Sequence, residues 1–582
     1  MDGPDKFNDN HADIPGPPII DIEADASKPV SRRRPTTSER MLHVSLACCM
    51  FPLLMLATTV LLFLMLTFVW KGNIDIVAHA SVVITLLLLT LVPCHLSCAG
   101  RCGIRSRLWR YVFIGAPFTA LVAFIGFFLG LFYSTEEVLL KTSYDASQPV
   151  LVVGTGPSGL SAAWMLAKSG RKVVLLEATD DIGGHSKTWV EPTDQGDFPV
   201  DIGYIFNNVN YHHYINFTNY FGYPRVDTAL NTSGAFNGRY WDNVHAERGR
   251  FGEDLEAEVD RFLELVRQPD DTLRYLTPLG AFLWWHGFSD DFYSLCLSSI
   301  LSVLFVTKMG ASRQCAQCTL NYFRTGDGFS HLRYERPMVQ NSPKGSQFMW
   351  RDIIADASAT GLLEIQLNSK VERLERVDDM WSAVLADGRR LSKFQDVILA
   401  IPASESGRIV PNPWHKFVLN QIDYITTFLT LHTDAEATVA KSHFAPAAGS
   451  PVLYFVDDDT MTGKIGQIFG DQDSDLLLTV HGDRNLINST KVKTQYAWSH
   501  HFFSLWEIAI ARKFVPMFNS KNGIHLAGDW IYGVGHNDAI RSGIAAACTA
   551  GLSKELPSSD PAGQLYSNFI SDVCQTEFAA LS

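Results

Sequence analysis

The chain has 582 residues, a formal net charge of −13 and 12% aromatic residues. Its length exceeds that of one ordinary domain and leaves room for a large apolar core. The acidic balance argues against nucleic-acid binding, which needs clustered basic side chains, so we expect no nucleic-acid partner.

The first 134 residues predict a tail followed by a membrane anchor. Residues 1–40 are rich in Pro, Asp and Ser and lack apolar periodicity, which is typical of a disordered tail. Within 41–134, three apolar stretches cover about 44–70, 76–96 and 109–133, each near the length of a transmembrane helix. Buried core helices are the alternative, favoured most for the second stretch, which contains a proline and two histidines.

Basic residues beside these stretches predict the orientation. Four arginines lie within 32–40 and four within 101–110. If both clusters are cytoplasmic, three spans leave the rest of the chain outside the cytosol. We therefore expect an integral membrane protein, of the endomembrane system such as the endoplasmic reticulum, with a catalytic part that is lumenal or otherwise extracytosolic. Three N-x-S/T sequons, at Asn216, Asn231 and Asn488, are compatible with this. With only two spans, the catalytic part would face the cytosol.

The stretch 149–185 has the order strand, glycine turn, helix, strand, acid. Val150 to Val153 lead into a turn with glycines at 154, 156 and 159, and the second strand ends at Glu177. Gly154 permits the tight turn, Gly156 lets the backbone approach a pyrophosphate, and Gly159 lets the helix pack on its strand. Pro157 and Ser158 open that helix, whose N-terminus attracts phosphates. Glu177 is placed to bind ribose hydroxyls, so we expect a dinucleotide site.

A second glycine pair narrows the choice of dinucleotide. Gly183, Gly184 and His185 follow the acid almost at once. This arrangement resembles that of FAD enzymes more than that of NAD dehydrogenases. A common glycine turn after a strand is the alternative.

The remaining chain alternates between helix-like and strand-like patterns. Residues 251–267 predict an amphipathic helix, and 347–358 a second helix. The apolar, aromatic segment 279–307 predicts buried helices that line a lipophilic pocket, or else a fourth membrane contact. Short strands then follow within 364–400, among them the one that contains Val371, which we include among the cofactor-binding candidates. Strand-like runs also occur within 406–500.

Near the C-terminus, an apolar strand ends in Gly528 and Asp529 and leads through a glycine turn into a helix rich in small residues. Asp529 is placed to meet the ribityl or pyrophosphate oxygens of a flavin nucleotide. The N-terminus of the helix, with His536, Asn537 and Asp538, can face the flavin edge where negative charge develops on reduction.

These patterns predict an α/β fold with a discontinuous, Rossmann-like FAD-binding domain and an α+β substrate domain, preceded by transmembrane helices. The FAD-binding domain takes 148–220, 345–405 and 501–582, the last with a C-terminal tail. The substrate domain takes 221–344 and 406–500.

Several motifs together carry a resemblance to a known family. They are VVGTGPSGLSAAWML, LLEATDDIGGHSKT, VDIGYIFNNVNYHHYINFTNYFG, LHTD, WSHHFF and AGDWIYGVGHNDAIRSG, spread over about 149–550. The chain resembles FAD-dependent oxidoreductases of the amine-oxidase and phytoene-desaturase superfamily. It is most similar to little-characterised bacterial and fungal members, and to the oxidase module fused to plant cyclopropane fatty acid synthases. The resemblance implies FAD buried between two domains and names no substrate.

Two departures from that family stand out. The run Gly535-His536-Asn537-Asp538 lacks one acidic group of the usual Gly-Phe-His-Glu-Asp. The arginine usual before the glycine pair is also absent, and Asp181 stands near its place. The first departure affects the chemistry at the flavin, and the second weakens the expected phosphate contact.

A flavin carries out hydride chemistry itself, while the protein supplies position and electrostatics. His536, His500 and His501 are candidate catalytic acid–base groups, with structural roles as the alternative. Cys315 and Cys318 form a single CxxC, for which a disulfide or core packing fits better than zinc, and we expect no metal site.

The sequence therefore predicts an FAD enzyme that oxidises, desaturates or isomerises a lipophilic small molecule, with an unidentified electron acceptor. A flavin-containing amine oxidase and a non-catalytic flavin-binding scaffold are the alternatives.

Overall fold

We describe a computed structural model of the protein. The chain divides into two compact units, Met1–Thr135 and Glu136–Ser582, and the described residues belong to the second. Those residues are 148–575 apart from 195, 229–230, 237–238, 243–252, 299–300, 302–310, 325–338, 435–452, 458–459, 465–474, 482–484, 506, 509–511, 534 and 553–560. The predicted tail and three spans lie outside them. Within them, no helix is both long and apolar enough to cross a membrane.

A five-stranded parallel sheet forms the first half of the catalytic unit. Its order is β10 (Leu363–Gln366), β2 (Val173–Leu176), β1 (Val150–Val153), β14 (Asp396–Leu399) and β20 (Ile524–Leu526). All four pairings are parallel. The strands come from three separate parts of the sequence, and their carboxyl ends meet at one edge, where ligands bind in open α/β sheets.

The alternation of side chains along β1 explains how this sheet is covered. Val150 and Val152 enter one core with three helices, α4 (Pro157–Lys168), α12 (Ser346–Ser358) and α17 (His536–Ala550). Leu151 and Val153 enter another core with the antiparallel strands β11 (Val371–Val377), β12 (Met380–Leu385) and β13 (Arg390–Phe394). Successive residues of a strand face opposite sides, so a strand with both faces buried is apolar throughout.

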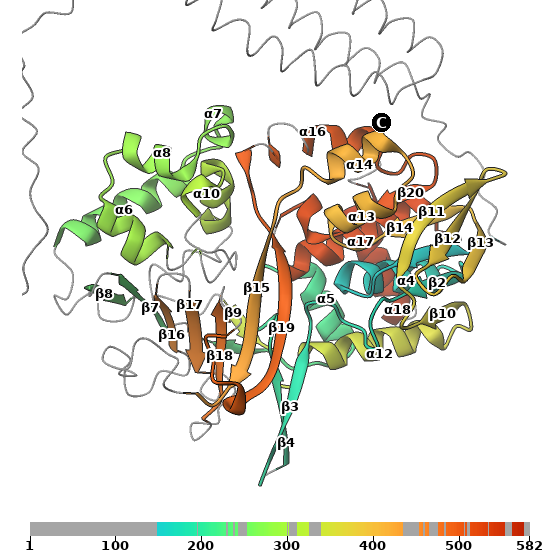
Figure 1. Ribbon diagram of the computed structural model, residues 1–582, viewed down its shortest axis with the longest axis horizontal. Helices are drawn as coiled ribbons and strands as arrows, with labels where there is room; N and C mark the ends of the chain where they lie inside the picture. Colours follow the sequence, from blue (N-terminus) through green and yellow to red (C-terminus); the bar gives the residue numbers. More distant parts are fainter. Residues whose placement is uncertain are drawn as a thin grey trace, which may run out of the picture. The chain divides into compact units, whose positions relative to one another are not determined.

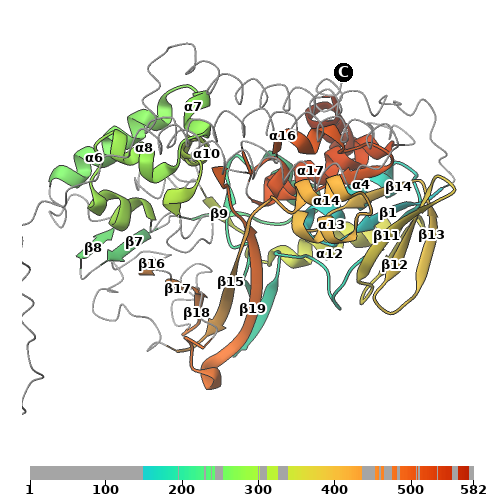
Figure 2. The same ribbon diagram turned by 45° about the horizontal axis from the view of Figure 1, so that its top comes forward.

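A seven-stranded sheet forms the second half. Its order is β19 (Val492–His501), β15 (Tyr424–His432), β18 (Leu477–His481), β17 (Thr460–Lys464), β16 (Leu453–Asp457), β7 (Asn231–Phe236) and β8 (Arg239–Asp242). Strands β15 and β19 pair from Tyr424 opposite His501 to His432 opposite Val492. In Figures 1 and 2 these two long strands run between the β11–β13 strands and a helical group.

That helical group has a core of its own. It contains α6 (Glu253–Arg267), α7 (Thr272–Tyr275), α8 (Leu279–Trp285) and α10 (Ala316–Arg324). In α6, Leu255, Val259, Phe262 and Val266 are all buried, which confirms the predicted amphipathic helix. Helix α12 and the strands predicted within 364–400 are likewise confirmed.

The prediction for 279–307 was wrong in part. Helix α8 has two faces: Phe282 and Leu283 are buried, whereas Trp284 and Trp285 are exposed. No described residue of this segment lines the cavity reported below. The general apolarity of a segment does not reveal which face of a short helix meets the core.

Cys315 and Cys318 form a disulfide, which was one of the two alternatives predicted from the sequence. A second disulfide joins Cys548, near the end of α17, to Cys574, and the sequence analysis did not predict it.

Candidate active site

Two glycine turns meet at the carboxyl edge of the parallel sheet. The turn after β1 contains Gly154 and Gly156, and the turn after β2 contains Gly184. A Cβ added to Gly184 would lie 2.9 Å from the Cα of Gly156, so the two backbones are nearly in contact. A Cβ added to Gly159 would lie 1.9 Å from the carbonyl oxygen of Gly154, which explains why α4 can start so close to β1.

The turns leave space where a pyrophosphate is expected. A Cβ on Gly156 would meet no protein atom within 4 Å, although its neighbours Gly154 and Gly159 are closely packed. Helix α4 begins beside this space with Gly156 as its N-cap, and no side chain caps its first turn. Free N–H groups at a helix start attract phosphate, so these residues fit the phosphates of a dinucleotide.

Glu177 is held beside the first turn by four hydrogen bonds. Its Oε2 accepts from the backbone N (3.0 Å) and the Oγ1 (2.5 Å) of Thr155. Its Oε1 accepts from the backbone N (2.9 Å) and the Oγ1 (3.0 Å) of Thr179. The carboxylate that would meet the ribose is therefore fixed in place before any ligand binds.

Asp181 takes part in a network behind the glycine pair. Its carboxylate accepts from Lys187 (2.8 Å), Arg351 (3.0 Å) and Gln347 (2.7 Å). Burial favours a higher pKa for Asp181, but the hydrogen bonds from Lys187 and Arg351 outweigh it and lower the pKa to about 2. Asp181 therefore binds cations of the protein itself, which keeps its charge from opposing a phosphate nearby.

A single cavity of about 430 Å³ connects this edge to the second sheet. At the sheet edge it is lined by Gly154, Gly156, Glu177 and Asp529. Its far end is apolar, with Ile205, Phe206, Leu429, Leu478 and Val480. The described residues that line it include no lysine or arginine.

Four histidines line the middle of the cavity: His185, His500, His501 and His536. The ring of His185 lies between Trp498, at 4.7 Å, and His500, at 4.9 Å. Burial lowers the pKa of His185, and burial with the neighbouring His185 and His501 lowers the pKa of His500 well below its ordinary value. Both rings are therefore neutral at physiological pH, because the low-polarity surroundings disfavour the charged form.

One ring nitrogen of His536, Nε2, already has a hydrogen-bond partner within the protein. Its Nε2 accepts a hydrogen bond from the indole N–H of Trp350 (2.9 Å) and lies 3.4 Å from the Oγ of Ser186. Burial lowers its pKa well below the ordinary value, so it too stays neutral. Because the lone pair of Nε2 already accepts a hydrogen bond from Trp350, His536 is a poorer general base than its position in the sequence suggested.

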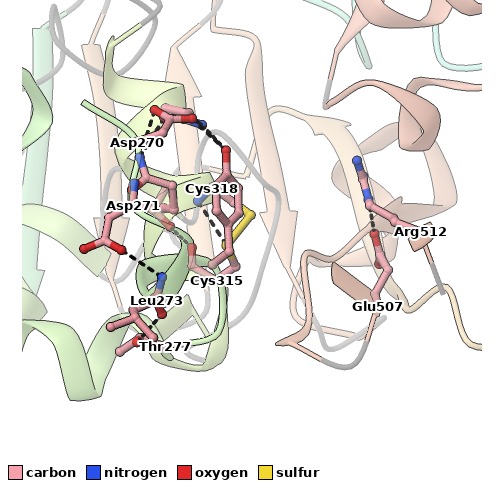
Figure 3. Close-up of a disulfide and its surroundings, with 12 residues drawn as sticks. Asp270, Asp271, Leu273, Thr277, Cys315, Cys318, Glu507 and Arg512 are labelled. Carbon is pink, nitrogen blue, oxygen red and sulfur yellow. Dashed lines mark hydrogen bonds and ion pairs between the residues drawn. A yellow bond between two sulfur atoms is a disulfide. The ribbon is translucent and has the colours of Figure 1, made fainter. Parts of the chain in front are cut away.

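His501 has the arrangement expected of a base. Its Nε2 lies 2.6 Å from Oε1 of Glu507, and both side chains are buried. Arg512 Nε also donates to that Oε1 (2.8 Å), so the carboxylate contacts both the guanidinium and the imidazole (Figure 3). A carboxylate that accepts Nε2–H leaves the lone pair on Nδ1. Within the described part of the chain, Nδ1 is buried and has no hydrogen-bond partner.

Most predicted site residues come together in the cavity. Its lining includes Gly154, Gly156, Pro157, Ser158, Glu177, Gly184, His185, Gly528, Asp529, His500, His501 and His536. Five others lie outside the lining: Gly159, Gly183, Val371, Asn537 and Asp538.

The five have visible uses in the fold. Gly159 separates α4 from the first turn, and Gly183 N donates to the carbonyl of Thr155 (2.9 Å). The Val371 side chain packs in the core beneath the β11–β13 strands. Asn537 Oδ1 accepts from the backbone N of His213 (3.0 Å), at the start of α5 (His212–Tyr220). The Asp538 carboxylate packs against the backbone of Gly533, since a Cβ added there would lie 2.3 Å from its Oδ2.

Several residues at the candidate site were not predicted from the sequence. Thr155, Ala400 and Tyr424 line the cavity, and Glu507 supports His501. Thr155 and Ala400 follow strands β1 and β14 directly, so the rule that ligands meet strand ends could have found them. Glu507 had no such signal.

Residues 157–431 match the family described as flavin containing amine oxidoreductase. The match confirms the predicted kinship with FAD-dependent oxidoreductases of the amine-oxidase superfamily, and the FAD cofactor that this kinship implies.

Curated relatives match over a short part of their length. An L-amino acid oxidase from Cerastes cerastes is 46% identical over 59 residues, which are 9% of this chain and 11% of that protein. A putrescine oxidase from Kocuria rosea is 42% identical over 60 residues, 10% of this chain and 12% of that protein. The chain thus matches about a tenth of the length of these relatives.

Solved structures with a similar fold cover more of the chain. A fatty acid isomerase from P. acnes, described as producing CLA, has a TM-score of 0.54 at 14% identity, over 69% of this chain and 98% of its own. Cyclohexylamine oxidase from Brevibacterium oxydans has a TM-score of 0.51 at 14% identity, with the same coverage. The fold is therefore the mixed α/β fold of FAD-binding oxidases.

Proposed function

We propose that the protein is a membrane-anchored FAD-dependent oxidoreductase that acts on an apolar small molecule. The observation that carries this proposal is the continuity of the cavity. Its dinucleotide end, at Gly156 and Glu177, opens without a break into an apolar end formed by Leu429, Leu478 and Val480. A substrate in the apolar end would lie next to a cofactor held at the other end.

The electrostatics of the lining support an uncharged substrate. A substrate carboxylate would need a cation, and the described lining contains neither lysine nor arginine. His185, His500 and His536 have lowered pKa values and stay neutral. An amino-acid substrate, which carries a carboxylate, therefore fits less well than an uncharged one, and the amine-oxidase reading keeps the support of the family match.

FAD, when bound, accepts a hydride from the substrate or returns one to it. The residues at Gly154–Ser158 and Glu177 would hold its dinucleotide part, and Gly528 and Asp529 would meet it from β20. His501, whose ring Glu507 orients, would take or supply the accompanying proton. The apolar side chains of the seven-stranded sheet would exclude water and align the substrate.

The proposed location is the lumenal side of the endoplasmic reticulum, with the anchor in 41–134. Two disulfides in the described chain support a compartment outside the cytosol, because disulfides persist in oxidising surroundings. Asn488 is exposed and begins an N-x-S/T sequon whose middle residue is not proline, so this unit has a possible glycosylation site at its surface.

The decisive experiment is anaerobic reduction of the bound flavin by the purified full-length protein. A panel of uncharged lipids, among them esters of unsaturated fatty acids, is compared with a panel of amines and amino acids. We expect lipids to bleach the oxidised flavin or to be isomerised in its presence. Bleaching by amines alone would favour an amine oxidase, and a tightly bound flavin that responds to neither panel would favour a scaffold.

A matched pair of variants tests whether the apolar end binds substrate. Val480→Thr adds a hydroxyl to the cavity wall at nearly constant volume, whereas Val377→Thr makes the same change on an exposed strand. We expect the first to raise the KM for the active lipid and the second to leave it unchanged. Equal kinetics in both variants would contradict binding at this end.

A further inference from the structure

Helix α7, the residue that follows it and helix α8 together expose four large apolar side chains. The exposed fractions are 71% for Leu273, 53% for Leu276, 77% for Trp284 and 79% for Trp285. We call these four residues the tryptophan patch. They make up four of the nine large apolar side chains that are exposed in the described part of the chain, and they fall within 13 residues. Clustered exposed apolar side chains mark an interaction surface.

The patch sits on a fixed support. On α8 the opposite face, with Leu279, Phe282 and Leu283, is buried in the core of the helical group. The guanidinium of Arg274 on α7 lies 5.8 Å from the ring of Phe282 on α8, which joins the two short helices.

The backbone beneath the patch is also held by the segment that contains the disulfide. Leu279 N donates to the carbonyl of Gln314 (2.8 Å), and Ala316 N donates to that of Thr277 (2.9 Å). Cys315 and Cys318 lie directly beside this connection (Figure 3). A surface that is already ordered loses little entropy when it binds a partner.

The charges next to the patch are compensated within the protein. Asp270 forms an ion pair with Arg324, and Asp271 caps α7 through Leu273 N (2.9 Å) and lies 4.0 Å from Arg274 Nε. These two pairs leave little net charge on the side of the patch formed by α7. Tryptophan favours the interface between lipid and water, where its ring meets both hydrocarbon and polar headgroups.

The position of the patch in the chain suggests its partner. The third predicted span ends near residue 133, and the described chain begins at 148. The connecting residues 134–147 reach at most about 50 Å when fully extended. A chain anchored by that span would therefore keep the catalytic unit close to a bilayer, and this step rests on the anchor in the proposed function.

We propose that the tryptophan patch docks the catalytic unit onto the surface of a phospholipid bilayer, with Trp284 and Trp285 at the level of the headgroups. Docking would hold the unit against the membrane in which a lipid substrate is dissolved. The occupant is the lipid surface, and a second copy of the chain is the competing occupant.

The test uses the full-length protein in phosphatidylcholine vesicles, with and without bromine atoms on the acyl chains. Bromine quenches only those tryptophans that reach the lipid. The Trp284→Ser/Trp285→Ser variant is compared with wild type, and Phe417→Ser, which removes another exposed aromatic ring, is the matched control. The absorbance of bound flavin reports that each variant is folded.

We expect bromolipid to quench more tryptophan emission in wild type than in the double variant. The difference should be about the contribution of two of the 13 tryptophans, and Phe417→Ser should match wild type. Equal quenching in wild type and the double variant would overturn the proposal. The proposal would also be overturned if light scattering showed wild type to be a dimer and the double variant a monomer, with equal quenching in both.

Flotation of the same vesicles separates this proposal from the anchor. A chain that floats in every variant but shows no quenching from the patch keeps the anchor and loses the docking surface. A chain whose flotation disappears in the double variant keeps the docking surface and loses the anchor.

Discussion

His501 Nε2 and Glu507 Oε1 lie 2.6 Å apart, and both side chains are buried. The pair is the one place in the described cavity wall where a histidine is oriented by a carboxylate and keeps its other ring nitrogen without a partner. An imidazole oriented in this way is suited to proton transfer.

Replacement of His501 by glutamine should slow substrate-driven reduction of the flavin by about 10²–10⁴-fold, because a positioned acid–base group contributes about that much. Glu507→Gln should reduce the rate less and displace its pH profile, since the ring would lose its orienting partner. Stopped-flow spectroscopy of the flavin measures both. His415→Gln is the control, because His415 stacks on Phe518 outside the cavity (4.2 Å), and an equal loss there would contradict the assignment.

Replacement of Gly184 by alanine should weaken FAD binding. A Cβ there would lie 2.9 Å from the Cα of Gly156 and would close the turn that faces the pyrophosphate. Gly222→Ala is the control, since Gly222 has a similar φ of 68° against 53° and its Cβ would meet nothing within 4 Å. Both variants incur about 1 kcal/mol of backbone strain. Flavin retained after gel filtration should therefore fall at least tenfold only in Gly184→Ala.

The buried carboxyl of Asp201 should make stability depend on pH. Burial raises its pKa to about 7 against the opposing hydrogen bonds from Thr188 and Ser346, whereas the ordinary value is 3.8. Between about pH 4 and 7 the folded chain holds a proton that the unfolded chain has lost. This contribution to stability is complete below pH 4 and is lost as the pH rises through 7.

The corresponding measurement is thermal unfolding of wild type and Asp201→Asn from pH 5 to pH 8. The wild type should lose on the order of 2–4 kcal/mol over this range relative to the variant, because the pKa shift spans about three units. Parallel curves for the two proteins would show that Asp201 is ionised throughout.

The disulfide between Cys548 and Cys574 should stabilise the fold of the C-terminal segment. It closes a loop with a sequence separation of 26 and joins α17 to η8 (Ile570–Cys574), which directly follows α18 (Pro561–Phe569). Cys548→Ala/Cys574→Ala should lower the free energy of unfolding by about 2–4 kcal/mol. Denaturant unfolding measures the loss. Addition of a reductant should lower the free energy of unfolding of wild type more than that of the double variant.

Glycosylation should distinguish among the sequons if the catalytic unit is lumenal. Asn488 is exposed, whereas Asn216 lies within α5, where the Thr218 of its sequon is buried. In a eukaryotic host we expect Asn488→Gln to remove a glycan, seen as a gel-mobility shift, and Asn216→Gln to have no effect. A chain that carries no glycan at Asn488 and is open to protease from the cytosol would reverse the proposed topology.

The parts of the site that the sequence could predict are those built from neighbours in the chain. β1, its glycine turn, α4 and β2 follow one another directly, so the local pattern determines the geometry of Gly154, Gly156 and Glu177. The same holds for Gly528 and Asp529 at the end of β20. Ligands in such sheets meet the ends of strands, and these can be read from the pattern alone.

The remaining parts depend on contacts between distant segments. The ring of His185 stacks on Trp498, more than 300 residues away, and no local pattern announces that pairing. Glu507 supports His501 because the chain turns back after β19, and this turn has no motif. Trp284 and Trp285 looked like core residues because tryptophan is apolar, but the buried face of α8 is already filled by Leu279, Phe282 and Leu283.

The cavity wall also has a consequence for biogenesis. Its first residues are at 154 and its last at 539, and those from β20 and α17 complete the end where Asp529 lies. During synthesis the pocket cannot close until residue 539 has left the ribosome. We therefore expect chains that stop before residue 528 to be produced without bound flavin.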